Sequence, residues 1–192
     1  MITSISMIDD FICAFNKHAD LYVIDEFHRD TKPFVVAEKN DLGFKKWRPL
    51  RFYTPPEKLD EIYQTTKGRF PKLFEELLLS YRWLEVDLTY ITLLPNLVSE
   101  DLKGFLYEIK KDKFMSKVLL ENNFIQFAKG PGGNYDPICF EVDNKKEIND
   151  YRIVQIDHEE LLCKERIKIV KEISKSMHEL MKKIIKNDIK DV

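Results

Sequence analysis

The sequence predicts an α+β fold, in which a small, antiparallel-rich mixed sheet packs against several helices and a long helix lies near the C-terminus. Helical periodicity dominates the first 121 residues, whereas short apolar segments separated by turn residues follow between Phe124 and Ile156. The connections between these segments are short, and short connections join antiparallel rather than parallel strands. Helices and strands that are segregated along the chain are typical of α+β domains.

The composition is that of one globular domain, which we place at residues 1–192. Of these 192 residues 44% are hydrophobic, enough for one substantial core. No repeat, low-complexity tract or linker rich in Pro, Gly or Ser marks an internal boundary. Lys and Arg number 31 against 33 Asp and Glu, a net charge of -2, so we expect neither a nucleic acid nor a membrane as partner. No apolar stretch approaches the roughly 18 residues of a membrane helix.

Three cysteines, Cys13, Cys139 and Cys163, indicate a reducing compartment. They are odd in number, widely spaced and without a CxxC pair. This pattern argues against a disulfide framework and against a structural zinc site. Asp9 and Asp10 lie where a signal peptide would be basic and apolar. We therefore expect a cytoplasmic protein with free thiols.

Apolar spacing predicts mainly helices in the first half of the chain. Pro56 is well placed in the first turn of a helix that continues through Leu59, Ile62 and Tyr63. The other expected elements are a helix over 7–18, a short strand over 34–37, a helix over 71–81, a strand region over 84–94, and one or two helices over 101–121.

Three strands and a long helix are expected in the second half. The strands span 124–128, 138–142 and 153–156. The glycines of GPGGN (130–134) suit the positive φ angles of a hairpin turn between the first two strands. A phosphate-binding loop is the alternative, but no helix with a Lys-Ser/Thr pair follows. The helix is expected to run on from Asp157, with an apolar stripe at Leu161, Cys163, Ile167, Val170, Ile173, Met177, Leu180, Met181 and Ile184.

The four ionisable residues DHEE (157–160) lie at the junction between the third strand and this helix. Asp157 occupies the expected N-cap position, and Glu160 three residues later completes a capping-box pattern. Glu159 and Glu160 fall in the first turn, where negative charge is favourable to the helix dipole. We interpret the cluster as a helix cap.

A metal or acid/base site is the alternative interpretation of the same cluster. Ligands on one helix face recur three or four residues apart, and after His158 these positions are Leu161 and Leu162. The HExxH pattern is absent. More distant residues could complete a site, but nothing in the sequence selects them; examples are Asp143, Asp150 and His178.

Two further candidates for a functional site, Cys139 and the YRW segment, are also better explained by structural roles. Cys139 could act as a nucleophile with His158 as its base, but it lies inside an apolar strand, where a thiol behaves as a small hydrophobic group. The aromatic pair of YRW (81–83) could stack on a ligand, but packing of Tyr81 and Trp83 into the core is favoured. We therefore expect no catalytic residue, no cofactor-binding residue, no bound cofactor and no metal site.

Four segments in a fixed order carry a resemblance to a known family. They are RFPKLFEELLLSYRW (69–83), LLPN (93–96), FIQFAKGPGGNYDPICFE (124–141) and DYRIVQIDHEELLCKERIKIV (150–170). In this order they resemble a bacterial group of the SUKH superfamily, the Smi-one/Knr-four type of proteins. The resemblance covers roughly Trp47 to Ile185 (47–185), and residues 1–46 could form an N-terminal extension. The chain departs from the family pattern at Ala128, at Glu141 and in SKSM (174–177).

The resemblance implies a compact α+β domain that binds protein and has no shared catalytic residues. Bacterial members are best known as immunity proteins that block a cognate toxin, whereas fungal relatives act as scaffolds. We therefore expect a non-enzymatic protein-binding domain whose partner is a toxin domain encoded nearby. A scaffold or regulatory protein is one alternative, and a small-ligand-binding protein or enzyme with a site assembled from distant residues is another. Exposed tyrosines or Trp47 are candidate centres of a protein interface.

Overall fold

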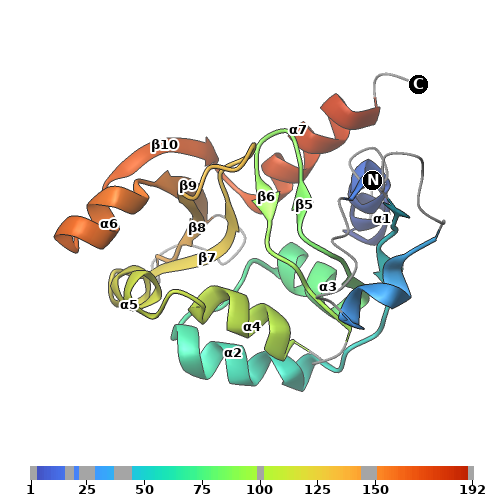
Figure 1. The fold of residues 1–192 in the computed structure, drawn as a ribbon, viewed down its shortest axis with the longest axis horizontal. Helices are drawn as coiled ribbons and strands as arrows, with labels where there is room; N and C mark the ends of the chain where they lie inside the picture. Colours follow the sequence, from blue (N-terminus) through green and yellow to red (C-terminus); the bar gives the residue numbers. More distant parts are fainter. Residues whose placement is uncertain are drawn as a thin grey trace.

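A six-stranded antiparallel sheet forms the centre of the computed structural model, which describes residues 4–15, 20–21, 29–36, 45–98, 102–143 and 151–189 (Figure 1). Its strand order is β10-β9-β8-β7-β6-β5. The strands are β5 (Val86–Asp87), β6 (Thr92–Leu93), β7 (Phe124–Lys129), β8 (Pro137–Glu141), β9 (Arg152–Ile156) and β10 (Ile169–Ser174). Every pairing between them is antiparallel. The predicted α+β class and the strands expected near 124–128, 138–142 and 153–156 are confirmed.

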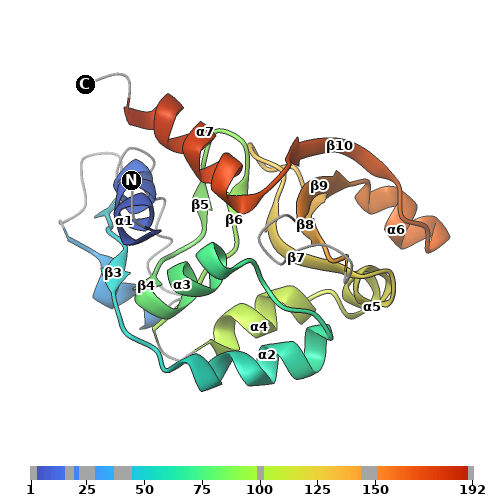
Figure 2. The same ribbon diagram turned by 180° about the vertical axis from the view of Figure 1, so that it is seen from behind.

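Helices pack on both faces and at the ends of this sheet. They are α1 (Ser4–Phe15), α2 (Leu59–Thr66), α3 (Lys72–Ser80), α4 (Lys103–Lys110), α5 (Lys113–Glu121), α6 (His158–Lys164) and α7 (Met177–Ile189), with short 3-10 turns η1 (Arg29–Phe34) and η2 (Pro56–Lys58). Two small antiparallel pairs join β1 (Asp20–Leu21) to β2 (Lys45–Lys46) and β3 (Leu50–Arg51) to β4 (Tyr81–Arg82). Figures 1 and 2 show α1 and α7 together at one end of the molecule and α5 and α6 at the other.

Side-chain alternation along the strands divides the interior into two cores. In β8 the Phe140 side chain belongs to the larger core and that of Cys139 to the smaller one. The larger core is rich in aromatic rings: Phe127 and Phe140 stack with centroids 4.1 Å apart, and the Phe74 ring lies 5.3 Å from each. The smaller core lies against α5 and α6 and contains Val118, Leu119, Phe124, Cys139, Val154, Ile156 and Leu161. The sheet therefore receives helices on both faces because apolar side chains alternate along its central strands.

Helix α1 belongs to the larger core, although it precedes the segment that carries the family resemblance. Phe11 and Phe15 are fully buried, and the Phe15 ring meets Trp83 edge to face at 6.3 Å. The Tyr81 hydroxyl donates a hydrogen bond to Asp9 at 2.6 Å, and burial together with this hydrogen bond raises the pKa of Tyr81 to about 12. Within the described residues the helix begins earlier than expected, at Ser4.

The long C-terminal helix expected from Asp157 is the largest correction. Helix α6 ends at Lys164, where Glu165 adopts a left-handed φ of 51° and stops the helix. The chain then returns as β10 beside β9, and a separate helix, α7, follows. The apolar residues of β10 and of its approach are β-branched (Ile167, Ile169, Val170 and Ile173), which favours a strand, and pairing satisfies the backbone of β9.

The short strand expected over 34–37 is also corrected. Phe34 ends the 3-10 turn η1, and Val35 forms an isolated bridge to Trp47. Ala37 lies outside the described residues. Packing of the buried Phe34 ring edge to face on Trp47, with centroids 6.3 Å apart, holds the segment without a regular strand.

Candidate functional site

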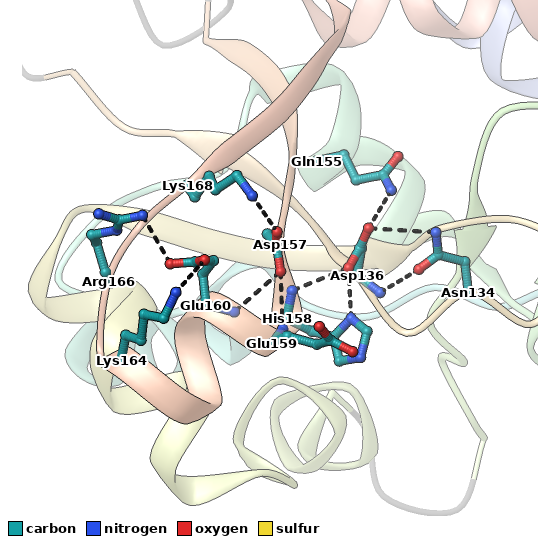
Figure 3. Close-up of polar contacts among 10 residues, drawn as sticks. All are labelled: Asn134, Asp136, Gln155, Asp157, His158, Glu159, Glu160, Lys164, Arg166 and Lys168. Atoms are coloured by element: carbon teal, nitrogen blue, oxygen red, sulfur yellow. Dashed lines mark hydrogen bonds and ion pairs between the residues drawn. The ribbon is translucent and has the colours of Figure 1, made fainter.

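Two carboxylates cap the beginning of α6 (Figure 3). The Asp157 carboxylate accepts hydrogen bonds from the backbone N–H groups of Glu159 and Glu160, both at 3.1 Å. The Asp136 carboxylate accepts the N–H of His158, also at 3.1 Å. The first three N–H groups of the helix thus have acceptors, and the predicted N-cap role of Asp157 is confirmed.

The expected capping box is not completed by Glu160, because its carboxylate does not accept the backbone N–H of Asp157. The Asp157 N–H donates to the Lys168 carbonyl at 2.9 Å, which continues the pairing of β9 with β10. The Glu160 carboxylate instead forms ion pairs with Lys164 at 2.8 Å and Arg166 at 2.9 Å. A hydrogen bond from Lys168 lowers the pKa of Asp157, and one from Lys164 lowers the pKa of Glu160. Both carboxylates are therefore held in their ionised form by local cations.

Asp136 is a central residue of this network that the sequence reasoning missed. It comes from the turn between β7 and β8, and its carboxylate accepts from Gln155 Nε2 at 2.7 Å and lies 2.6 Å from His158 Nδ1. Asn134 Nδ2 is a more distant donor at 3.4 Å. Partial burial works to raise the pKa of Asp136, but these hydrogen bonds outweigh it, so the pKa is lowered. The YDP segment (135–137) was the signal in the sequence that could have drawn attention to Asp136. Because it lies far from His158 in sequence, the contact between the two residues could not be predicted.

The Asp136–His158 pair has the geometry that orients an imidazole for proton transfer. With Nδ1 directed at a carboxylate, Nε2 remains the basic nitrogen, as in a carboxylate–histidine pair that serves a nucleophile. The His158 side chain is 34% exposed, so solvent reaches this residue. Cys139 is fully buried in the smaller core, and burial raises the pKa of its thiol well above the ordinary value, which disfavours it as the nucleophile.

No group of three His, Cys, Asp or Glu side chains within the described ranges lies close enough together to hold a metal ion. In the DHEE cluster the carboxylates of Asp157 and Glu160 already accept hydrogen bonds from backbone N–H groups, lysines and an arginine. The absence of a bound metal stays a prediction, which elemental analysis can test.

The GPGGN segment forms the hairpin turn that its glycines predict. Gly132 and Gly133 have φ angles of 68° and 82°, in the left-handed region that favours glycine. The Gly132 N–H donates to the Asp87 carboxylate at 3.1 Å, and the Gly130 N–H donates to the Asp136 carbonyl at 2.9 Å. These backbone donors bind groups of the chain itself, as expected for a structural turn.

The YRW segment packs into the core, as predicted, and Arg82 between the two aromatic residues is also fully buried. Its guanidinium donates to the Leu78 carbonyl at 2.8 Å and to the Thr54 hydroxyl. Trp47 is only 1% exposed, so it is not available as an interface centre and that expectation is wrong.

Large apolar side chains that remain exposed are the other candidates for function. They are Val36, Tyr53, Tyr107, Phe114, Tyr135, Leu162, Ile169 and Val170. Tyr107 and Phe114 lie on the consecutive helices α4 and α5, whereas Ile169 and Val170 lie on β10, an edge strand of the sheet. Register shifts and Lys171 interrupt β10, and bulges and charged side chains both protect edge strands from pairing with other chains.

A scan against protein-family models and a search of the curated proteins found no match to this chain. Among the helices that the structure describes, none has the length and apolar character needed to cross a lipid bilayer.

Proposed function

We propose that this chain is a non-enzymatic protein-binding domain that neutralises a cognate bacterial toxin. The observation that carries the binding function is a pair of large aromatic side chains, Tyr107 and Phe114, exposed by 61% and 40% on α4 and α5. Aromatic residues bury a large area at a low entropy cost and are enriched among the residues that dominate protein interfaces.

These aromatic side chains lie on helices whose opposite faces are packed into the protein core. Helix α4 buries Phe105, Leu106 and Ile109 in the larger core. Helix α5 buries Val118 and Leu119 in the smaller core. Its N-cap also binds the backbone of the aromatic residue itself, since the Asp112 carboxylate accepts from the Phe114 N–H at 3.0 Å and the Met115 N–H at 2.8 Å. A surface held in this way loses little conformational entropy on binding.

The resemblance to the SUKH superfamily supports an immunity protein as the specific form of this function. The partner is then a toxin domain encoded nearby, and an inhibitory interface burying roughly 1,200 to 2,000 Å² in total is typical. A scaffold or regulatory protein uses the same kind of surface without a toxin.

Co-expression with the products of neighbouring genes tests the proposal. An immunity protein restores growth of cells that express the toxin and co-purifies with it. An inactive toxin variant serves as a control, because it should still co-purify although there is no toxicity to relieve. Binding to a neighbour without relief of toxicity points to a scaffold, and no binding to any neighbour contradicts the proposal.

A second candidate function, acid/base catalysis by His158, is favoured by the 2.6 Å contact between Nδ1 and Asp136. It predicts a turnover that is lost in both His158→Gln and Asp136→Asn while the fold is retained. Replacement of exposed Tyr53 by Ala is a matched control that should leave such a turnover unchanged. A reproducible turnover with this pattern, together with no binding to any neighbour, replaces the binding function with an enzymatic one.

A further inference from the structure

The segment from Tyr107 to Lys117 combines exposed aromatic side chains with exposed lysines. Of its eleven positions seven are exposed, and they carry two aromatic rings, four ammonium groups and one carboxylate. We call the six aromatic and cationic residues the α4–α5 surface; they are Tyr107, Lys110, Lys111, Lys113, Phe114 and Lys117. Figures 1 and 2 show the two helices following one another along the same side of the molecule.

Helical spacing groups these side chains within each of the two helices. Lys110 and Lys111 lie three and four residues after Tyr107, and Lys111 keeps helical backbone angles at the end of α4 (φ -55°, ψ -46°). Tyr107 and the two lysines therefore share a face of the helix. The chain turns at Asp112, and Phe114 then lies in the first turn of α5, with Lys117 three residues further on the same face.

The charge of the α4–α5 surface is positive, in contrast with the chain as a whole. Between residues 107 and 117 four lysines face two acidic residues, a net of +2 on a chain whose total is -2. Asp112 is used to cap α5, and Glu108 forms an ion pair with Lys111 at 3.2 Å. Within the described part of the chain, Lys110 and Lys113 have no carboxylate at ion-pair distance, so both are available to an external anion.

We propose that the α4–α5 surface is the docking site for an acidic protein surface, in which carboxylates meet Lys110 and Lys113 and an apolar recess receives Tyr107 and Phe114. This inference rests on the proposed protein-binding function and specifies the chemistry of the partner. It also limits which face of the toxin is covered. A positively charged face would be repelled by these lysines, so the partner is bound at an acidic face.

A protein fits this surface better than a nucleic acid. Phosphate backbones are bound by several lysines or arginines that neutralise successive charges, and affinity grows with their number. Here two of the four lysines already have carboxylate partners: Lys111 pairs with Glu108, and Lys117 lies 4.0 Å from Glu121. The interspersed carboxylates repel phosphates, whereas a folded protein can place its own charges to match both signs.

An NMR titration of the full chain with a short peptide that alternates Glu and Leu tests the docking chemistry without the natural partner. At low salt the peptide should shift backbone amides of α4 and α5. The double variant Lys110→Glu/Lys113→Glu should weaken this binding by about tenfold or more, because two attractions become repulsions. Lys182→Glu/Lys186→Glu, which reverses two exposed lysines on α7 and changes the net charge by the same amount, is the matched control and should change the affinity by less than about twofold.

Two outcomes overturn the inference. One is a Lys110→Glu/Lys113→Glu variant that binds the peptide as the wild type does. The other is single-stranded DNA or a phosphatidylserine vesicle that binds α4 and α5 more tightly than the peptide. Neither outcome depends on the co-expression assay, so failure of the docking site and failure of the proposed function are distinguishable. Once a neighbouring toxin is found to bind, the Lys110→Glu/Lys113→Glu variant should also lose co-purification and rescue.

Discussion

Replacement of Asp136 by Ala should destabilise the protein more than any other single change in the α6 cap. The carboxylate is 13% exposed and accepts three close contacts: the His158 N–H, His158 Nδ1 and Gln155 Nε2. The Gln155 amide is buried, and a buried donor without an acceptor costs about 1–3 kcal/mol. The two His158 donors are partly open to water, so each should cost only about 0.5–1 kcal/mol. The expected loss is therefore about 2–5 kcal/mol.

Chemical denaturation followed by tryptophan fluorescence measures this loss, since both tryptophans are buried in the native state. The midpoint should fall while the slope with denaturant stays constant, as expected when stability changes without a change in the surface exposed. A double-mutant cycle of Asp136→Ala with Gln155→Ala should show a coupling energy of about 0.5 kcal/mol or more. Additive effects of the two changes, or a loss below about 1 kcal/mol for Asp136→Ala, would refute the network as a stabilising element.

Three further measurements test the ionisation of Asp136, the N-cap at Asp157 and the burial of Cys139. The difference in free energy of unfolding between wild type and Asp136→Asn should be largest near neutral pH and should decrease as the pH falls below about 4. The reason is that a carboxyl whose pKa is lowered on folding no longer stabilises the protein once it is protonated. A difference that stays constant down to acid pH contradicts this. Asp157→Ala should lower the melting temperature through loss of the N-cap, with no effect of added chelator, and elemental analysis that finds stoichiometric zinc or iron would show instead that a metal is bound. A thiol reagent such as Ellman's reagent should modify Cys13 and Cys163 in the native protein and Cys139 only after unfolding, and rapid modification of all three would contradict the burial of Cys139.

Local interactions explain which features could be predicted from the sequence. The N-cap at Asp157 and the turn at Gly132 depend on residues within three or four positions of each other, so the sequence displays both partners. The strand that contains Cys139 could also be predicted, because a continuous run of apolar residues indicates a strand that is buried on both faces. The α+β class followed from the order of these local signals along the chain.

Only the tertiary structure determined the features that depend on partners far apart in sequence. The segment 165–176 has apolar residues at helical spacing, yet it contains β10 because the backbone of β9 is hydrogen-bonded on that side by this strand. Asp136 caps a helix that begins 22 residues later, and Arg82 reaches the hydroxyl of Thr54, 28 residues earlier. Neither contact leaves a periodic pattern in the sequence, since polar groups pair wherever the fold brings a donor and an acceptor together. For the same reason, the exposure of Tyr107 and Phe114 depends on how α4 and α5 pack against the rest of the protein.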